Sequence, residues 1–243
     1  MDWYCKLYEG REFFADKDEE KAYREKQRGF TRPEVQSFCR LLGLASGSKI
    51  LDVYCGNGRH SVELAQQGFQ VVGVDIAFSR ISFARNWARD EGVRAAFLLG
   101  DAQALPLRRA FEAVLILGGS FTHCPEEEKN ISLLQGFRAV LKPRGLLLID
   151  NPNPLRFWRI QHPEGTLAEQ RKVPHFDLPL GQGETSGYVR YYCIDKMKNL
   201  FKKADFDVQG ILGSRGREPY TAESPRMIII GQPQAAHDPG ATQ

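Results

Sequence analysis

The chain has 243 residues, a net charge of +3 at pH 7 and an apolar fraction of 42%. This length fits one large α/β domain, and the apolar fraction supports a sizeable core. No run of about 18 apolar residues is present, so we expect no membrane-spanning helix. The first residues carry acids and no apolar stretch typical of a secretory signal. The small net charge gives no indication of a nucleic-acid-binding face.

The cysteines are odd in number, lie far apart and form no C-x-x-C pair; they are Cys5, Cys39, Cys55, Cys124 and Cys193. This pattern supports neither a disulfide framework nor a zinc site, so we expect no metal. Free cysteines are typical of a reducing compartment, and we therefore expect a cytoplasmic protein.

Residues 1–30 combine many charges with seven aromatic residues. We interpret this stretch as a helical segment that either packs on the outside of the domain or covers the ligand site as a lid. Thr31 is a suitable N-cap, Pro33 fits a first helical turn and Glu34 completes a capping box. The sequence thus predicts a helix that starts at Thr31 and ends near Gly43, with a domain that spans 31–232 and a disordered tail at 233–243.

The stretch 49–77 predicts a strand, a glycine loop, a helix and a second strand, which is one unit of an open parallel sheet. Gly56 and Gly58 allow the backbone to approach a ligand closely. Asp75 ends the second strand, where an acid can bind a ribose diol. These features indicate a nucleoside ligand at the carboxyl ends of the strands.

The loop fits NAD less well than another nucleoside ligand. A dinucleotide fingerprint has three glycines, and Ser61 occupies the third position here. Asp52, inside the first strand, would repel a pyrophosphate and suit a cationic ligand. Because serine is also small, this test disfavours NAD without excluding it.

The residues 52–58, DVYCGNG, resemble the D-x-G-C-G-x-G loop of class I S-adenosylmethionine (SAM) dependent methyltransferases. Further matches at residues 59–75 are similar to a stand-alone branch thought to act mostly on small molecules. Tyr54 departs from the pattern, because many members have glycine there. The resemblance implies SAM as the cofactor and a set of cofactor-binding residues: Asp52, Tyr54, Gly56, Asn57, Gly58, Asp75, Ile76, Asp101, Ala102 and Gly118.

The resemblance also implies the fold. We expect an α/β, doubly wound, mostly parallel seven-stranded sheet with an antiparallel C-terminal edge hairpin, the Rossmann-like methyltransferase fold. Residues 100–106, GDAQALP, are similar to the segment in which an acid and the next backbone N–H meet adenine. The alternative for Asp101 is a simple helix N-cap.

Residues 118–124 follow the fourth predicted strand, beside the expected methyl donor. The loop lacks the (Asp/Asn)-Pro-Pro-aromatic pattern of DNA amino-group methyltransferases. His123 is its one side chain with a pKa suited to proton removal near neutrality. It is our candidate catalytic residue, with a loop-shaping role as the alternative, since proximity alone can drive methyl transfer.

Residues 151–190 form a long insertion rich in proline, glycine and charge, and we predict a substrate-side element there. Our candidate substrate-binding residues are Asn151, Tyr220 and Arg226.

The sequence favours transfer of a methyl group from SAM to O, N or C of a small-molecule metabolite by a monomer or homodimer. The alternatives are an RNA or protein methyltransferase, for which basic clusters would contact phosphates, and a SAM-binding protein without methyl transfer. We do not expect a membrane or nucleic-acid partner.

Overall fold

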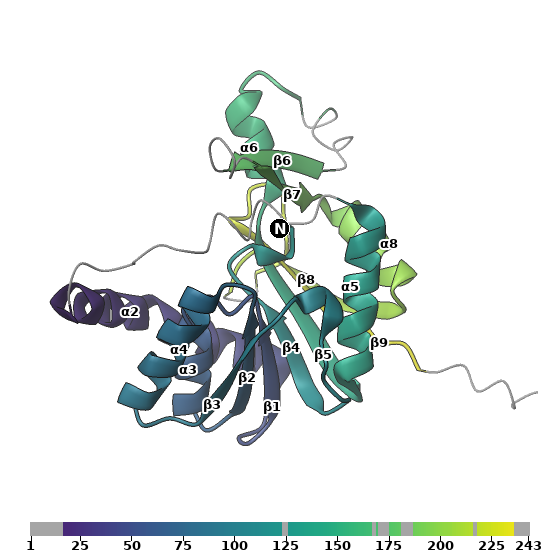
Figure 1. The fold of residues 1–243 in the computed structure, drawn as a ribbon. Helices are drawn as coiled ribbons and strands as arrows, with labels where there is room; N and C mark the ends of the chain where they lie inside the picture. The colour runs from purple at the N-terminus through teal and green to yellow at the C-terminus, as the bar shows by residue number, and fades with distance from the viewer. Residues whose placement is uncertain are drawn as a thin grey trace, which may run out of the picture.

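The computed structural model describes residues 17–122, 126–166, 169, 175–180, 187–215 and 218–235. Its centre is a seven-stranded sheet in the order β3-β2-β1-β4-β5-β9-β8 (Figure 1). The strands are β1 Lys49–Val53, β2 Gln70–Asp75, β3 Ala95–Leu99, β4 Phe111–Ile116, β5 Leu141–Pro152, β8 Phe206–Leu212 and β9 Arg226–Pro233. All neighbours from β3 to β5 pair in parallel, and β9 pairs antiparallel with both β5 and β8. The predicted fold class is confirmed.

Helices cover both faces of the sheet (Figure 1). The helices are α2 Lys17–Leu42, α3 Arg59–Gln66, α4 Phe78–Asp90, α5 Glu127–Val140, α6 Pro154–Gln161 and α8 Ile194–Lys203, with short 3-10 turns η1 Ala102–Ala104 and η2 Ser120–Thr122. Helices α2, α3 and α4 pack on one face of the sheet, and helices α5 and α8 pack on the opposite face. Among the described residues, no helix is long and apolar enough to cross a bilayer.

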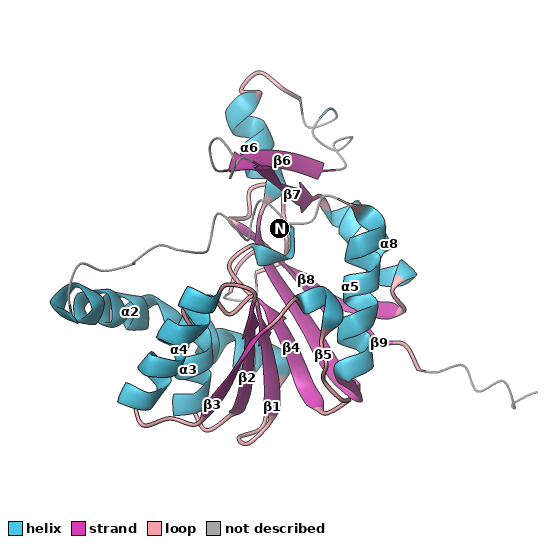
Figure 2. Cartoon of the chain, in the orientation of Figure 1, coloured by secondary structure: helices cyan, strands magenta, loops and turns pink. Residues whose placement is uncertain are grey.

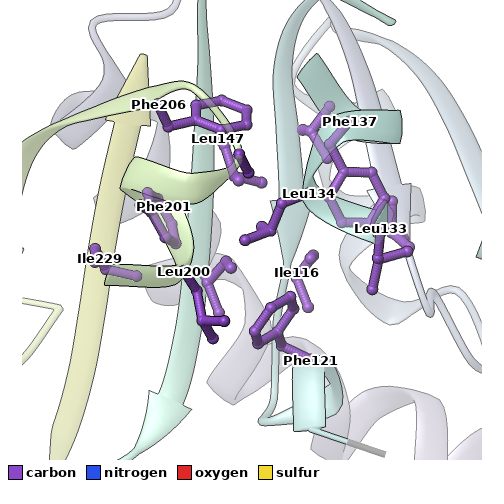
Figure 3. Packing of buried hydrophobic residues seen from close by; sticks show 14 of the residues in the cluster. Ile116, Phe121, Leu133, Leu134, Phe137, Leu147, Leu200, Phe201, Phe206 and Ile229 are labelled. Carbon is purple, nitrogen blue, oxygen red and sulfur yellow. The ribbon is translucent and has the colours of Figure 1, made fainter. Parts of the chain in front are cut away.

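The core on the α5/α8 face forms because apolar residues recur at helical spacing on both helices. Leu134 and Phe137 of α5 meet Leu200 and Phe201 of α8 over the sheet residue Leu147 (Figure 3). All five side chains are completely buried. This core fixes the carboxyl ends of β4 and β5, from which the site is built.

The predicted helix start at Thr31 is wrong, because α2 is continuous from Lys17 to Leu42 with Pro33 inside it. Thr31 does not cap a helix: its hydroxyl accepts a hydrogen bond from Arg59 of α3 at 2.9 Å. Proline removes one backbone hydrogen bond, and packing on the sheet outweighs this loss. The expected boundary between 30 and 31 therefore falls within one helix, and residues 1–16 of the predicted lid lie outside the described residues.

Strand β5 begins at Leu141 and includes Pro143 and Gly145, residue types that are typical of turns. Phe111 pairs with Leu141, and Ala113 then pairs with Leu146, so β5 uses more residues than β4 over this step. The turn signals of the sequence thus produce a bulge inside a strand.

The predicted insertion forms a small lobe of α6 and a separate two-stranded sheet, β6 His175–Leu180 and β7 Gly187–Tyr192 (Figure 2). Phe157 of α6 stacks on Phe176 and Tyr191, with ring centroids 5.5 Å apart in each pair. These rings give the lobe a core of its own. Of the predicted tail at 233–243, the residues from 236 onward lie outside the described residues.

Candidate active site

The glycine loop joins β1 to α3, and its conformation requires small residues. Gly58 has φ 80° and is the N-cap of α3. A Cβ at Gly58 would lie 2.7 Å from Ala84 Cβ of α4, so no larger residue fits. Gly56 also has a positive φ, of 54°. The loop therefore brings backbone N–H groups at the start of α3 to the carboxyl edge of the sheet.

Tyr54 adopts a backbone conformation that favours glycine. Its φ is 58°, and such a conformation costs a bulky residue on the order of 1–3 kcal/mol. Its ring packs against the core on the α5/α8 face, which offsets this cost. The departure from the family pattern thus lies at a strained position next to the expected ligand.

Asp75 binds the glycine loop through its side chain. One carboxylate oxygen accepts a hydrogen bond from Gly56 N at 2.8 Å, and the other accepts one from Ala77 N at 3.0 Å. These bonds fix the orientation of the carboxylate, and each oxygen keeps a further lone pair. The arrangement fits the expected contact with a ribose diol.

Asp52 is 1% exposed and accepts a hydrogen bond from the Ser61 hydroxyl at 2.6 Å. Burial raises its pKa, although His60 and the Ser61 hydroxyl oppose the rise. Through this hydrogen bond, Asp52 connects β1 to the first turn of α3 on either side of the glycine loop. Its direct contact with the cofactor stays a prediction.

Asp101 caps the turn η1, because its Oδ1 accepts a hydrogen bond from Gln103 N at 2.9 Å. The capping role considered as the alternative is therefore present, and the adenine role stays a prediction. Gly100 N donates to the Asp75 carbonyl at 3.0 Å, which places the ends of β2 and β3 side by side. Ala102 is buried directly after Asp101, and Ile76 is half-buried beside Asp75.

Gly118 follows β4 with φ 78°, and a Cβ built on it would meet no atom within 4 Å. Open space thus borders the backbone at this strand end. In the loop, Asn57 Oδ1 is buried and has no partner among the described residues. A cradle with free space and an unpaired buried oxygen fits a polar cofactor such as SAM.

The end of β5 carries the two completely buried polar residues Asp150 and Asn151. Asp150 forms ion pairs with Arg215 at 2.8 Å and with Arg226 at 2.6 Å. Both amide atoms of Asn151 lack a hydrogen-bond partner among the described residues. Asn151 pairs across the sheet with Met227, a member of the core on the α5/α8 face, so its side chain lies on that face.

The other predicted substrate residues have partners within the protein. Arg226 also donates to the Asp150 carbonyl at 2.9 Å. The hydroxyl of Tyr220 donates to Asn153 Oδ1 at 2.8 Å, and burial raises the pKa of Tyr220. Both side chains brace the end of β5, and their contact with a substrate stays a prediction.

The lobe approaches the methyl-donor side of the sheet. A Cβ at Gly119 would lie 2.9 Å from Pro152 Cδ and 3.3 Å from the Tyr191 hydroxyl. The end of β4, the end of β5 and strand β7 therefore meet at one point. His123, the predicted catalytic residue, lies outside the described residues.

Sequence reasoning missed one group of residues at this edge. Glu34 of α2 contacts Arg59, His60 and Arg215. Its partners lie far apart in the chain, and no local motif marks them. The ring of His60 is buried and bonded to Glu34 at 2.9 Å.

Comparison with known proteins points to one family. A family model described as a methyltransferase domain matches residues 50–145. The cypemycin N-terminal methyltransferase of Streptomyces sp is 28% identical over 204 residues, which cover 76% of this chain and 82% of the relative. A glycine/sarcosine N-methyltransferase of Aphanothece halophytica is 29% identical over 167 residues, and this match covers 68% of this chain and 55% of the relative.

Solved structures show the same fold. The glycopeptide N-methyltransferase MtfA, complexed with S-adenosyl-L-homocysteine (SAH), matches with a TM-score of 0.63 at 18% identity. The match covers 83% of this chain and 89% of that protein. The glycine loop, the acid after β2 and the strand order occur together in a chain that matches a methyltransferase domain. The chain therefore contains a methyltransferase domain, it has the fold of the class I SAM-dependent methyltransferases, and its cofactor is SAM.

Proposed function

We propose that the protein transfers the methyl group of SAM to a small-molecule acceptor, with nitrogen favoured over oxygen and carbon as the attacked atom. Two of the three proteins named above are N-methyltransferases by name, and the third is named an N-terminal methyltransferase. The chain spans about half the length of the glycine/sarcosine enzyme it matches. The proposal therefore extends to an amine acceptor in general and not to a particular one.

The observation that carries the proposal is the unpaired amide of Asn151. Leaving a buried polar group without a partner costs about 1–3 kcal/mol. The amide lies next to the end of β4, because Gly119 N donates to the Asp150 carbonyl at 3.0 Å. An acceptor amine that donates to Asn151 Oδ1 would satisfy the oxygen and would be held beside the methyl donor.

The chemistry needs little beyond this positioning. Bound SAM supplies a methyl group on a sulfonium, which is an excellent leaving group. Asp75 and the glycine loop orient the cofactor, and Asn151 orients the acceptor nitrogen. Correct placement of the two reactants provides much of the rate, and His123 takes the proton or shapes the loop.

Binding to RNA is less well supported. Lys196 and Lys203 of α8 both pair with Glu127 of α5. In α2, Arg24 pairs with Asp90 and Arg28 with Glu91. These four cations are thus paired with acids of the protein itself, which leaves fewer positive groups on α2 and α8 to contact phosphates.

The test is SAH formation with a panel of primary and secondary amines, with alcohols, phenols and total RNA as further acceptors. We expect turnover with at least one amine. Turnover on RNA that falls steeply with salt would overturn the small-molecule proposal in favour of the RNA alternative. Tight SAM binding without SAH formation on any acceptor would leave a SAM-binding protein that does not methylate.

A second test addresses His123. Replacement by alanine should lower kcat with the amine found in the screen while the Kd for SAM stays within about twofold, because the side chain acts on the acceptor. Equal kcat in the variant would remove His123 from the mechanism. Replacement of His162, an exposed histidine of the lobe, is a matched control.

A further inference from the structure

The carboxylate of Glu34 lies at the centre of a charged cluster on the α2/α3 side of the site. One of its oxygens contacts Arg59 Nη1 at 2.8 Å and His60 Nε2 at 2.9 Å. The other contacts Arg215 Nη1 at 2.7 Å. The Glu34 side chain is 13% exposed. Three side chains from two separate parts of the chain therefore share this one carboxylate.

Two of these partners belong to the cofactor half of the site. Arg59 and His60 are the first residues of α3, directly after Gly58 of the glycine loop. The hydroxyl of Thr31 on α2 also accepts a hydrogen bond from Arg59. Helix α2 thus holds the start of α3 by side chains on successive turns.

The third partner leads to the other half of the site. Arg215 lies between β8 and β9, and its guanidinium donates to Asp150 Oδ2 at 2.8 and 3.2 Å. The hydroxyl of Ser37 on α2 donates to the Arg215 carbonyl. The same arginine therefore connects α2 to the end of β5, one residue before Asn151.

The charges in this chain of contacts depend on one another. The pKa of Glu34 falls to about 2: burial raises it, but the His60 hydrogen bond and the charges of Arg59 and Arg215 lower it further. Burial lowers the pKa of His60, so the ring is neutral near pH 7. Removal of Glu34 would leave Arg59 and Arg215 close together without the carboxylate between them.

We propose that Glu34 and Arg215 are positioning residues which connect the end of β5 to the glycine loop, so that a change at Arg215 alters SAM binding although Arg215 lies outside the predicted cofactor-binding set. Asp150, Arg215, Glu34 and Arg59 form an unbroken series of contacts, in which each residue contacts the next at hydrogen-bond distance. The inference concerns cofactor binding and does not depend on the nature of the acceptor.

The experiment measures the Kd of SAM and of SAH by calorimetry for Glu34→Gln, Arg215→Gln and the double variant. We expect each single variant to raise both Kd values about 3- to 30-fold, within the range reported for residues that couple distant sites. The Kd values of the double variant should be close to those of the single variant that binds SAM more weakly, because either change breaks the same chain of contacts. A Kd within twofold of the parent in Arg215→Gln would overturn the proposal, as would full additivity.

Two controls separate positioning from general damage. Arg32→Gln breaks another α2–α3 ion pair, with Glu63 at 3.1 Å, that does not lead to β5. It should leave the Kd of SAM within twofold. Arg215→Lys keeps the charge but loses the two-pronged contact, and it should show a smaller rise in Kd at a melting temperature close to that of the parent. An equal rise in Arg32→Gln would show that any loosening of α2 weakens SAM binding and would overturn the specific role of Arg215.

Discussion

Asp150 and Asn151 are neighbours on β5, both are completely buried, and they differ in nearly everything else. Asp150 accepts hydrogen bonds from two arginines on the α2/α3 side of the sheet. Asn151 lies on the α5/α8 side and has no partner among the described residues. Because successive side chains of a strand point to opposite faces, the two residues serve different surroundings.

On the Asp150 side, the buried polar group has its partners within the protein. On the Asn151 side, the buried polar group is available to a ligand. A buried carboxylate needs positive partners within the fold, since its charge is too costly to leave unpaired. A neutral amide costs less, so the fold can hold it open for a ligand. We therefore assign stability to the Asp150 side and acceptor recognition to the Asn151 side.

The largest expected effect comes from Asp150→Ala. This change leaves Arg215 and Arg226 without their shared carboxylate, and because both arginines are partly exposed, we take the cost of the lost hydrogen bonds between charged groups as about 1.5–3 kcal/mol. We expect the free energy of unfolding in urea to fall by that amount. The matched change Asn151→Leu, at the adjacent position, should leave stability unchanged or slightly raised, because it removes an unpaired amide.

Equal destabilisation by the two substitutions would break the comparison. It would show that Asn151 is already satisfied inside the fold, by groups outside the described residues or by buried water. Its role in acceptor binding would then have no support.

The sequence was sufficient where the signal is local. The stretch 49–75 has short apolar runs and glycines at fixed spacing, and it forms the predicted strand, glycine loop, helix and second strand with Asp75 at its end. It failed where distant partners decide. Thr31 and Pro33 form a convincing helix start, yet α2 continues through them. Likewise, nothing near Asp150 in the sequence indicates that Arg215 and Arg226 pair with it.

Asp75→Ala should have the next largest effect, on SAM binding. Asp75 resembles Asp150 in burial, but its partners are backbone N–H groups of the glycine loop. Loss of the carboxylate removes the predicted bonds to the ribose and releases the loop. We expect the binding free energy to weaken by roughly 1–3 kcal/mol.

Calorimetry with SAM, SAH and NAD in parallel measures this effect. The parent protein should bind the first two ligands and not NAD. Unchanged affinity for SAM in the variant would refute the ribose assignment of Asp75, and binding of NAD would reopen the interpretation of Asp52.

Asn151→Ala tests the other side of the comparison with a smaller expected change. A neutral hydrogen bond contributes about 0.5–1.5 kcal/mol, so the KM of the amine acceptor should rise about two- to tenfold. The Kd for SAM should stay the same, since the change lies on β5 and leaves the glycine loop intact. Steady-state kinetics at saturating SAM measure the first value, and an unchanged KM would place the acceptor elsewhere.

The smallest effect is the pH dependence that Glu34 contributes to stability. Its pKa lies at about 2 in the folded protein, below the ordinary 4.5. Its contribution is therefore fully present above about pH 4.5 and is lost as the pH falls from 4.5 towards 2.

The titration of His60 adds a second loss of stability below pH 6.5, because burial lowers the pKa of His60 in the folded state. Because Glu34 also raises the pKa of His60, the gap in unfolding free energy between the parent and Glu34→Gln should be constant from pH 8 to 6.5, widen slightly as the pH falls towards 5, and narrow from pH 4.5 to 3. A gap that stays constant down to pH 3 would mean that the partners of Glu34 do not hold it ionised. The conclusion that charged groups on the α2/α3 side are stabilised by partners within the protein would then be wrong.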